Sequence, residues 1–116
     1  DFLPTIGKII QHDLIILATP VYWYSMSAQM KTFIDRISDL LSIKKDLGRK
    51  LRGKRIFVIA SFSTSLPKGF EEQFSQTCEY LGMKYEGCSF IYNGNDIELN
   101  KNNILEISKA KAIINN

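Results

Sequence analysis

Short apolar runs alternate with segments of helical periodicity, and this alternation constrains the fold more than any other feature of the sequence. Asp13–Ala18 and Ile56–Ala60 are rich in branched apolar residues, which is typical of strands buried on both faces. Tyr85–Tyr92 is predicted to form a third strand. Strands that alternate with helices of about 10–15 residues indicate an α/β fold with a parallel sheet and right-handed crossovers.

The segments between the runs carry apolar residues at helical spacing. We predict helices over Asp1–Gln11, Ala28–Leu41 and Leu66–Leu81, with Gly82 ending the third, and a last helix capped by Asn100. The second helix has the clearest pattern, formed by Met30, Phe33, Ile34, Ile37, Leu40 and Leu41. Either Ser25 or Ser27 is expected to cap it.

Composition excludes several classes of protein. A chain of 116 residues with 45% hydrophobic and 23% charged residues is typical of one globular domain, predicted here over residues 1–116. A net charge of +3 is too small to indicate nucleic-acid binding, and no apolar run is long enough to span a bilayer. Cys78 and Cys88 are expected to be buried thiols of a reducing compartment. We therefore predict a cytoplasmic protein without nucleic-acid or membrane partners.

The predicted topology restricts where a ligand can bind. Ligands of open parallel α/β sheets bind beyond the carboxyl ends of the strands, which here are Thr19–Ser25, Ser61–Ser65 and Tyr92–Asn95. The basic connector Lys44–Arg55 leads into the second strand and therefore lies at the opposite end. It is either a solvated connector, which we favour, or a patch that binds phosphate or nucleic acid.

The segment Thr19–Ser25 is the most informative of these loops, because Tyr22, Trp23 and Tyr24 are consecutive aromatic residues. They suit either a flat conjugated ligand or a partner subunit, and the sequence favours neither. The hydroxyl groups of Ser61–Ser65 either bond the polar edge of a ligand or cap the next helix.

No catalytic constellation is present in the sequence. His12 is the single histidine and precedes the first strand, at the wrong end of the predicted sheet for the ligand site. It is expected to be an ordinary surface residue. We therefore predict no nucleophile–histidine pair, no catalytic side chain and no metal site.

One stretch, Asp13–Arg36, closely resembles the flavodoxin-like NAD(P)H-dependent FMN reductase family, which includes quinone reductases and iron–sulfur flavoproteins. The resemblance rests on a Thr-Pro-x-Tyr-Trp loop, which begins at Thr19, followed by Ser-Ala-Gln-Met-Lys-x-Phe-Ile-Asp-Arg, which begins at Ser27. Leu51–Arg55 is similar to the segment that leads into the family's fourth strand. Cys78 and Cys88 do not match the cysteine cluster of the iron–sulfur flavoproteins.

The resemblance implies a flavodoxin-like three-layer sandwich with a parallel sheet. The family's sheet has five strands in the order 2-1-3-4-5, and this chain resembles the C-terminal part, from the helix before the third strand. The first two strands and the phosphate-binding loop have no counterpart. We therefore expect one edge of Leu14–Ala18 to be bare unless a partner or further residues cover it. We also expect these 116 residues alone to bind FMN weakly or not at all.

The resemblance further implies an oxidoreductase that holds FMN and passes electrons from NAD(P)H to a flavin, quinone or similar small acceptor. By this resemblance the cofactor-binding residues are Thr19, Pro20, Val21, Tyr22, Trp23, Tyr24, Ser25, Ser61, Phe62, Ser63 and Thr64. A homodimer or higher oligomer is expected. The alternatives are a flavodoxin-type electron carrier, which the charge of +3 disfavours, and a cofactor-free interaction module of the same fold.

Overall fold

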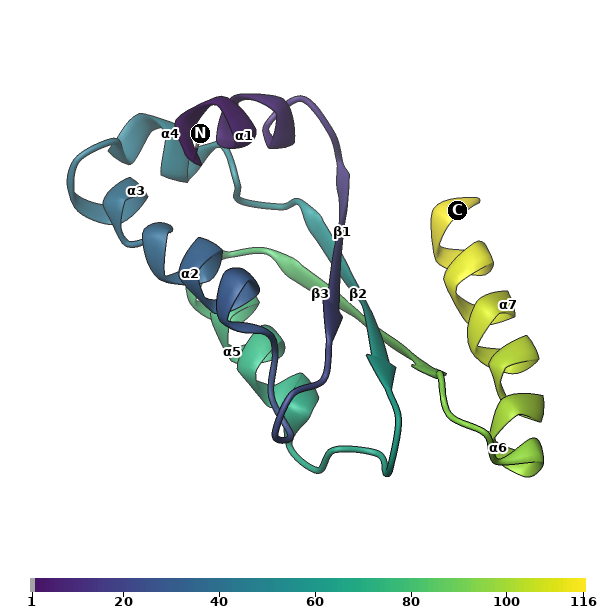
Figure 1. The fold of residues 1–116 in the computed structure, drawn as a ribbon. Coiled ribbons are helices and arrows are strands. Elements are labelled where there is room, and N and C mark those ends of the chain that lie inside the picture. The colour runs from purple at the N-terminus through teal and green to yellow at the C-terminus, as the bar shows by residue number, and fades with distance from the viewer. Residues whose placement is uncertain (1) are drawn as a thin grey trace.

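The computed structural model describes residues 2–116, in which three parallel strands form one sheet in the order β1-β2-β3 (Figure 1). The strands are β1 (Leu14–Pro20), β2 (Arg55–Phe62) and β3 (Lys84–Tyr92). Ile15 lies beside Ile56, and Val58 lies beside Cys88. The prediction of a parallel sheet is confirmed.

Helices cover both faces of this sheet and give three layers (Figure 1). They are α1 (Phe2–Ile9), α2 (Ala28–Arg36), α3 (Asp39–Ser42), α4 (Lys45–Arg49), α5 (Phe70–Leu81), α6 (Ile97–Lys101) and α7 (Asn103–Ile114). The buried core joins one face of the sheet to α5 and α2, while α7 packs against β3 and β2 on the other face. The predicted α/β sandwich is confirmed.

The central strand β2 is buried on both faces, as its sequence predicts. Phe57 and Val58 point to opposite faces and are both fully buried. On the α5 side, Val58 belongs to the same cluster as Phe70 and Phe74, whose rings lie 5.3 Å apart. Burial of each such side chain stabilises the fold by about 1.5–3 kcal/mol.

The prediction that the first strand is buried on both faces is wrong. Ile15 is buried, but Ile16 is 38% exposed and Ala18 is also exposed. Ile16 and Ala18 face the side of the sheet on which α7 packs against β3 and β2. Strand β1 pairs with β2 along one edge, and its other edge has no strand partner within residues 2–116.

The predicted helix Ala28–Leu41 is interrupted. Its N-cap is Ser27, one of the two predicted caps, which accepts a hydrogen bond from the Met30 amide. The amides of Ile37 and Ser38 then bond to carbonyls three residues back, so the chain tightens between α2 and α3. The basic connector Lys44–Arg55 contains the short helix α4.

Two predicted helix starts are also wrong. Helix α5 begins after Gly69, whose φ of 74° is left-handed, and Pro67 restricts the residue before it. The last helix, α7, begins at Asn103 with Asn102 as its N-cap, and the predicted cap Asn100 lies inside the short helix α6, which Asp96 caps by accepting a hydrogen bond from the Leu99 amide at 3.1 Å. Gly82 ends α5 with a φ of 73°, as predicted. Asp1, the start of the first predicted helix, lies outside the described residues.

Both cysteines are free and buried, as predicted. Burial raises the pKa of the Cys78 thiol to about 11 and, with the nearby Glu71 carboxylate, that of the Cys88 thiol to about 12. Both thiols therefore stay protonated at neutral pH, and their role is packing.

A glycine sets the contact between α3 and α4. A Cβ atom at Gly48 would lie 2.4 Å from the backbone oxygen of Leu40, which is itself buried. We predict that Gly48→Ala lowers the free energy of unfolding by about 1–3 kcal/mol, because the clash is with backbone that cannot give way. Urea unfolding measures this change.

The matched control is Gly7→Ala in α1, where no atom lies within 4 Å of the new Cβ. This substitution is expected to raise the free energy of unfolding by up to about 1 kcal/mol, because alanine is the better helix former. Equal effects at the two positions would contradict the packing argument.

Candidate functional site

The loops that follow β1 and β2 meet at the carboxyl edge of the sheet, at the lower end of Figure 1. The amide of Val21 donates to the carbonyl of Ser61 at 2.8 Å and joins the two loops. Between them lies an open groove of about 200 Å³. Its lining residues are Val21, Trp23, Tyr24, Phe62, Ser63, Thr64 and Ser65.

A tight turn presents the aromatic residues. Tyr22 and Ser25 exchange two backbone hydrogen bonds, of 2.9 and 3.1 Å, which close a two-residue loop. The central residues Trp23 and Tyr24 have φ values of 49° and 67°. Positive φ at both positions is what a type I′ turn requires, and Asn-Gly is the usual pair there. Left-handed backbone at a residue other than glycine costs about 1–3 kcal/mol.

The side chains of this turn project into solvent. Trp23 is 90% exposed, Tyr24 63% and Tyr22 60%. Trp23 and Tyr24 line the groove, whereas Tyr22 does not. A strained backbone that holds large exposed rings adds little to the stability of the fold, so the turn is a candidate binding element.

The residues behind the turn fix the ends of its loop. Thr19 is buried, and its hydroxyl oxygen accepts a hydrogen bond from the Ser27 amide at 2.9 Å and donates to the carbonyl of Pro20. Ser25 donates through its hydroxyl to Oε1 of Gln73 in α5, at 2.8 Å. Thr19, Pro20 and Ser25 therefore support the turn and do not line the groove.

The second loop supplies one ring and three hydroxyl groups. Phe62 ends β2 and is buried, with its ring 5.4 Å from that of Tyr92. Ser63, Thr64 and Ser65 are exposed, and their hydroxyls bond to no group within residues 2–116. The alternative that one of them caps α5 is wrong, because Gly69 is the N-cap of that helix.

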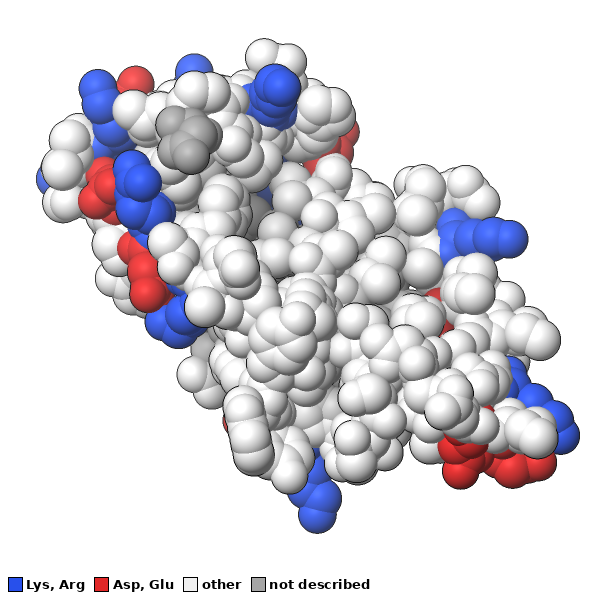
Figure 2. Space-filling view, in the orientation of Figure 1, with Lys and Arg blue, Asp and Glu red and all other residues white. Residues whose placement is uncertain are grey.

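The groove is electrically neutral. No Asp, Glu, Lys or Arg lines it, and the surface over β1 and the two loops is largely free of charged side chains (Figure 2). The N-terminus of α2 lies at the same edge and contributes the positive end of a helix dipole. The arrangement suits a flat, conjugated ligand with a polar edge.

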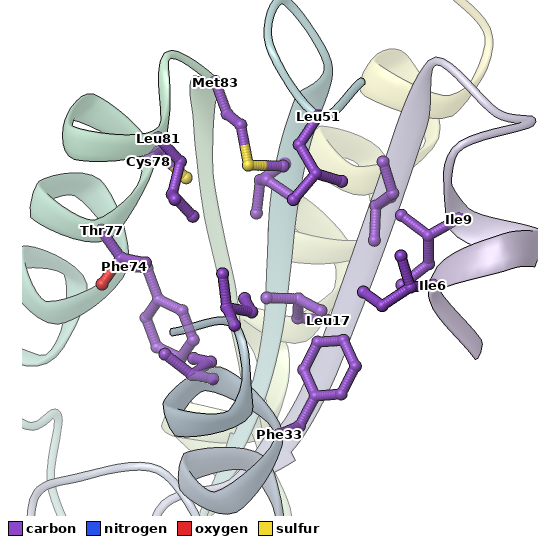
Figure 3. A pocket seen from close by; sticks show the side chains of 14 residues that line it. Ile6, Ile9, Leu17, Phe33, Leu51, Phe74, Thr77, Cys78, Leu81 and Met83 are labelled. Carbon is purple, nitrogen blue, oxygen red and sulfur yellow. The ribbon is translucent and has the colours of Figure 1, made fainter. Parts of the chain in front are cut away.

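Two other pockets are less suited to binding a flat ligand with a polar edge. An apolar cavity of about 40 Å³ lies inside the core between α1, α2 and α5 (Figure 3). Its one lining hydroxyl, on Thr77, donates to the carbonyl of Gln73, so the cavity is a packing void. Lys45, Arg49 and Arg52 line a groove at the opposite end of the sheet, where the basic connector was predicted.

His12 is exposed, as predicted, and its Nδ1 lies 2.9 Å from the Lys8 carbonyl. Residues 2–116 contain no group of three or more His, Cys, Asp or Glu that could hold a metal ion. None of the helices in this range is long and apolar enough to cross a membrane.

Sequence reasoning missed one residue that supports the site, Gln73. Ser65 lines the groove, within the loop Ser61–Ser65 that the topology predicted, although the residues assigned by resemblance end at Thr64. Gln73 contacts the turn from a helix 48 residues away in sequence. Nothing local to Gln73 marks it, because its periodic position is that of an ordinary half-buried helix residue.

Comparison with known proteins identifies the family. A family model described as having a flavodoxin-like fold matches residues 3–112, and the chain belongs to this family. The match agrees with the three-layer architecture and with a groove at the carboxyl ends of the strands.

Two curated relatives match part of the chain. A Bacillus subtilis protein, YwqN, is provisionally named an NAD(P)H-dependent FMN-containing oxidoreductase and is 34% identical over 92 residues, which is 75% of this chain and 51% of the relative. An uncharacterised NAD(P)H oxidoreductase of Escherichia coli, YcaK, is 27% identical over 95 residues, 75% of this chain and 48% of its own length. The chain thus spans about half the length of these relatives.

Solved structures share the fold. The Trp repressor binding protein of Bacillus subtilis superposes with a TM-score of 0.79 at 26% identity, over 96% of this chain and 69% of the other. The general stress protein 14 of Treponema denticola, solved in complex with FMN, gives 0.67 at 17% identity, over 97% and 72%. At 17% identity, the likeness to the Treponema denticola protein concerns the fold alone.

The strain in the turn can be tested by relieving it. We predict that the double variant Trp23→Asn/Tyr24→Gly unfolds at higher urea concentration, with a gain of about 1–2 kcal/mol, because these residues adopt positive φ readily and little buried surface is lost. Tyr22→Gly is the control: Tyr22 is about as exposed as Tyr24 but has no positive φ, so this substitution should not stabilise the chain. A double variant less stable than the control would contradict the argument from strain.

Proposed function

We propose that residues 1–116 form the C-terminal part of one flavodoxin-like domain in an FMN-dependent oxidoreductase, which passes electrons from NAD(P)H to a flavin, quinone or similar small acceptor. The observation that carries the proposal is the uncharged groove, where exposed aromatic rings on a strained turn face a loop of unbonded hydroxyls. The names of the two curated relatives support the same activity.

The groove residues fit the isoalloxazine ring of FMN. Trp23 and Tyr24 offer aromatic surface for stacked or edge-on contact, and Phe62 offers apolar surface at the base of the groove. Ser63 and Thr64 can donate to carbonyl oxygens and ring nitrogens at the polar edge of the flavin. We assign direct contact with the ring to Val21, which lines the groove. Tyr22 does not line the groove, and we assign it to support of the turn, which it closes with Ser25.

The remaining predicted residues act behind the ring in this proposal. Thr19 and Pro20 hold the end of β1, Ser61 accepts the Val21 amide that joins the loops, and Ser25 ties the turn to α5. The flavin itself would supply the redox chemistry, by accepting a hydride from NAD(P)H. The protein would bind the ring, orient it and shield one of its faces, and no side chain need act as an acid or base.

The phosphate group of FMN finds no partner in the groove, since no lysine or arginine lines it. We therefore expect these 116 residues alone to bind FMN weakly or not at all. The exposure of Tyr22 and Trp23 also supports a homodimer or higher oligomer, in which part of the aromatic surface meets a second subunit. The two free cysteines support a reducing, cytoplasmic location.

The proposal predicts a flavin-dependent reductase. We expect the whole protein, of which this chain is proposed to be the C-terminal part, to show a bound flavin spectrum with added FMN and to support steady NAD(P)H oxidation with a quinone or flavin acceptor. Slow turnover would indicate an electron carrier, and no flavin binding by the whole protein would contradict the proposal.

The aromatic residues of the groove can be tested one at a time in the whole protein. Trp23→Ala and Tyr24→Ala should each raise the Kd for FMN about threefold to tenfold, the loss of one aromatic contact. Tyr80→Ala, at a residue 79% exposed on α5, is the control and should leave the Kd unchanged.

A further inference from the structure

The strained turn is fixed in place by one side chain from another element. Within residues 2–116, the Ser25 hydroxyl makes the one side-chain hydrogen bond that links residues 22–25 to the rest of the protein, by donating to Oε1 of Gln73 at 2.8 Å. The backbone bonds between Tyr22 and Ser25 close the turn on itself. They do not fix its orientation relative to the sheet.

Gln73 is itself held rigidly by the core. Its neighbours Phe70 and Phe74 are both 1% exposed and lie in the cluster beneath the sheet. The side-chain nitrogen of Gln73 donates to the carbonyl of Phe70 at 3.4 Å, and the backbone carbonyl of Gln73 accepts from the Thr77 hydroxyl at 2.7 Å. The side-chain amide is therefore bonded to α5 as well as to the turn.

The hydrogen bond between Ser25 and Gln73 matters because the turn carries no glycine. Val21 is fixed before the turn by Ser61, and Ser27 is fixed after it by Thr19. Between these two points the backbone at Trp23 and Tyr24 has φ values that most residues avoid, so a released turn would move to less strained conformations. In the structure, the bond at Ser25 is present in the conformation in which both rings line the groove.

We propose that Gln73 is a positioning residue of the flavin site: through Ser25 it holds the turn in the left-handed conformation that presents Trp23 and Tyr24 to the ligand. The proposal rests on the proposed function only for the identity of the ligand. The ordering of the turn is a property of the protein without flavin and can be measured separately.

Trp23 is the single tryptophan of the chain, so its fluorescence reports on the turn directly. In flavin-free protein, Gln73→Met and Ser25→Ala are expected to lower the fluorescence anisotropy of Trp23, because the turn gains motion. Gln73→Glu keeps an acceptor oxygen for Ser25 but loses the bond to the Phe70 carbonyl, so the anisotropy should fall less than in Gln73→Met. Gln76→Met, at an exposed residue on the same helix, is the control and should change nothing.

FMN titration of the whole protein provides the second measurement. Gln73→Met and Ser25→Ala are each expected to raise the Kd about tenfold, and the double variant should be no weaker than either single variant, because all three remove the same hydrogen bond. Gln73→Glu should raise the Kd less than Gln73→Met, because it keeps an acceptor for the Ser25 hydroxyl. Urea unfolding of each variant shows that the fold is intact.

The two proposals fail differently. If the whole protein binds no FMN but the anisotropy falls in both single variants, the flavin proposal is contradicted and the positioning role stands. If the anisotropy of Trp23 is the same in the unmodified chain, Gln73→Met and Ser25→Ala, the positioning role is overturned, whatever the flavin result. Additive effects of the two substitutions on the Kd would also overturn it.

Discussion

Parallel pairing of β1 with β2 is the constraint on which the site depends. Because both strands run in the same direction and Pro20 lies beside Ser61, their loops leave the sheet at one edge and at one level. The Val21 amide extends this pairing by one more hydrogen bond to Ser61. Without that register, the aromatic turn and the hydroxyl loop would not face each other across a groove.

The free energy of the core maintains a turn that is unfavourable by itself. Two left-handed aromatic residues cost several kcal/mol together and leave their rings in water. The packing of Phe70 and Phe74 against β2 fixes α5, and α5 in turn fixes the acceptor that holds Ser25. Stability gained in the interior thus permits strain at the surface, a division often found where a protein binds ligands.

The sequence predicts the strands and the location of the site well, because both follow from short-range patterns and topology. Burial on two faces produces the continuous run of β2, and strand direction alone places the loops after Ala18 and Ala60 at one edge. The exposure of Ile16 could not be predicted, since the run in β1 is as apolar as that in β2 and only the position of α7 distinguishes them.

The helix boundaries and Gln73 were missed for a different reason. The break after Arg36 depends on amides that bond three residues back, and the start of α5 depends on the left-handed Gly69, neither of which alters the apolar periodicity. Gln73 acts through a partner 48 residues away, so no local pattern marks it. Apolar periodicity therefore predicts where helices lie, but not where they break or which distant residues they contact.

The fluorescence of Trp23 during FMN titration tests the central claim, that the carboxyl-edge groove holds the flavin ring against the strained turn. We predict a saturable loss of Trp23 emission, because a flavin in contact with an indole quenches it, with the same midpoint as binding measured by equilibrium dialysis. If dialysis shows FMN bound while Trp23 emission changes no more than in a mixture of free tryptophan and FMN, the ring lies elsewhere and the account is contradicted.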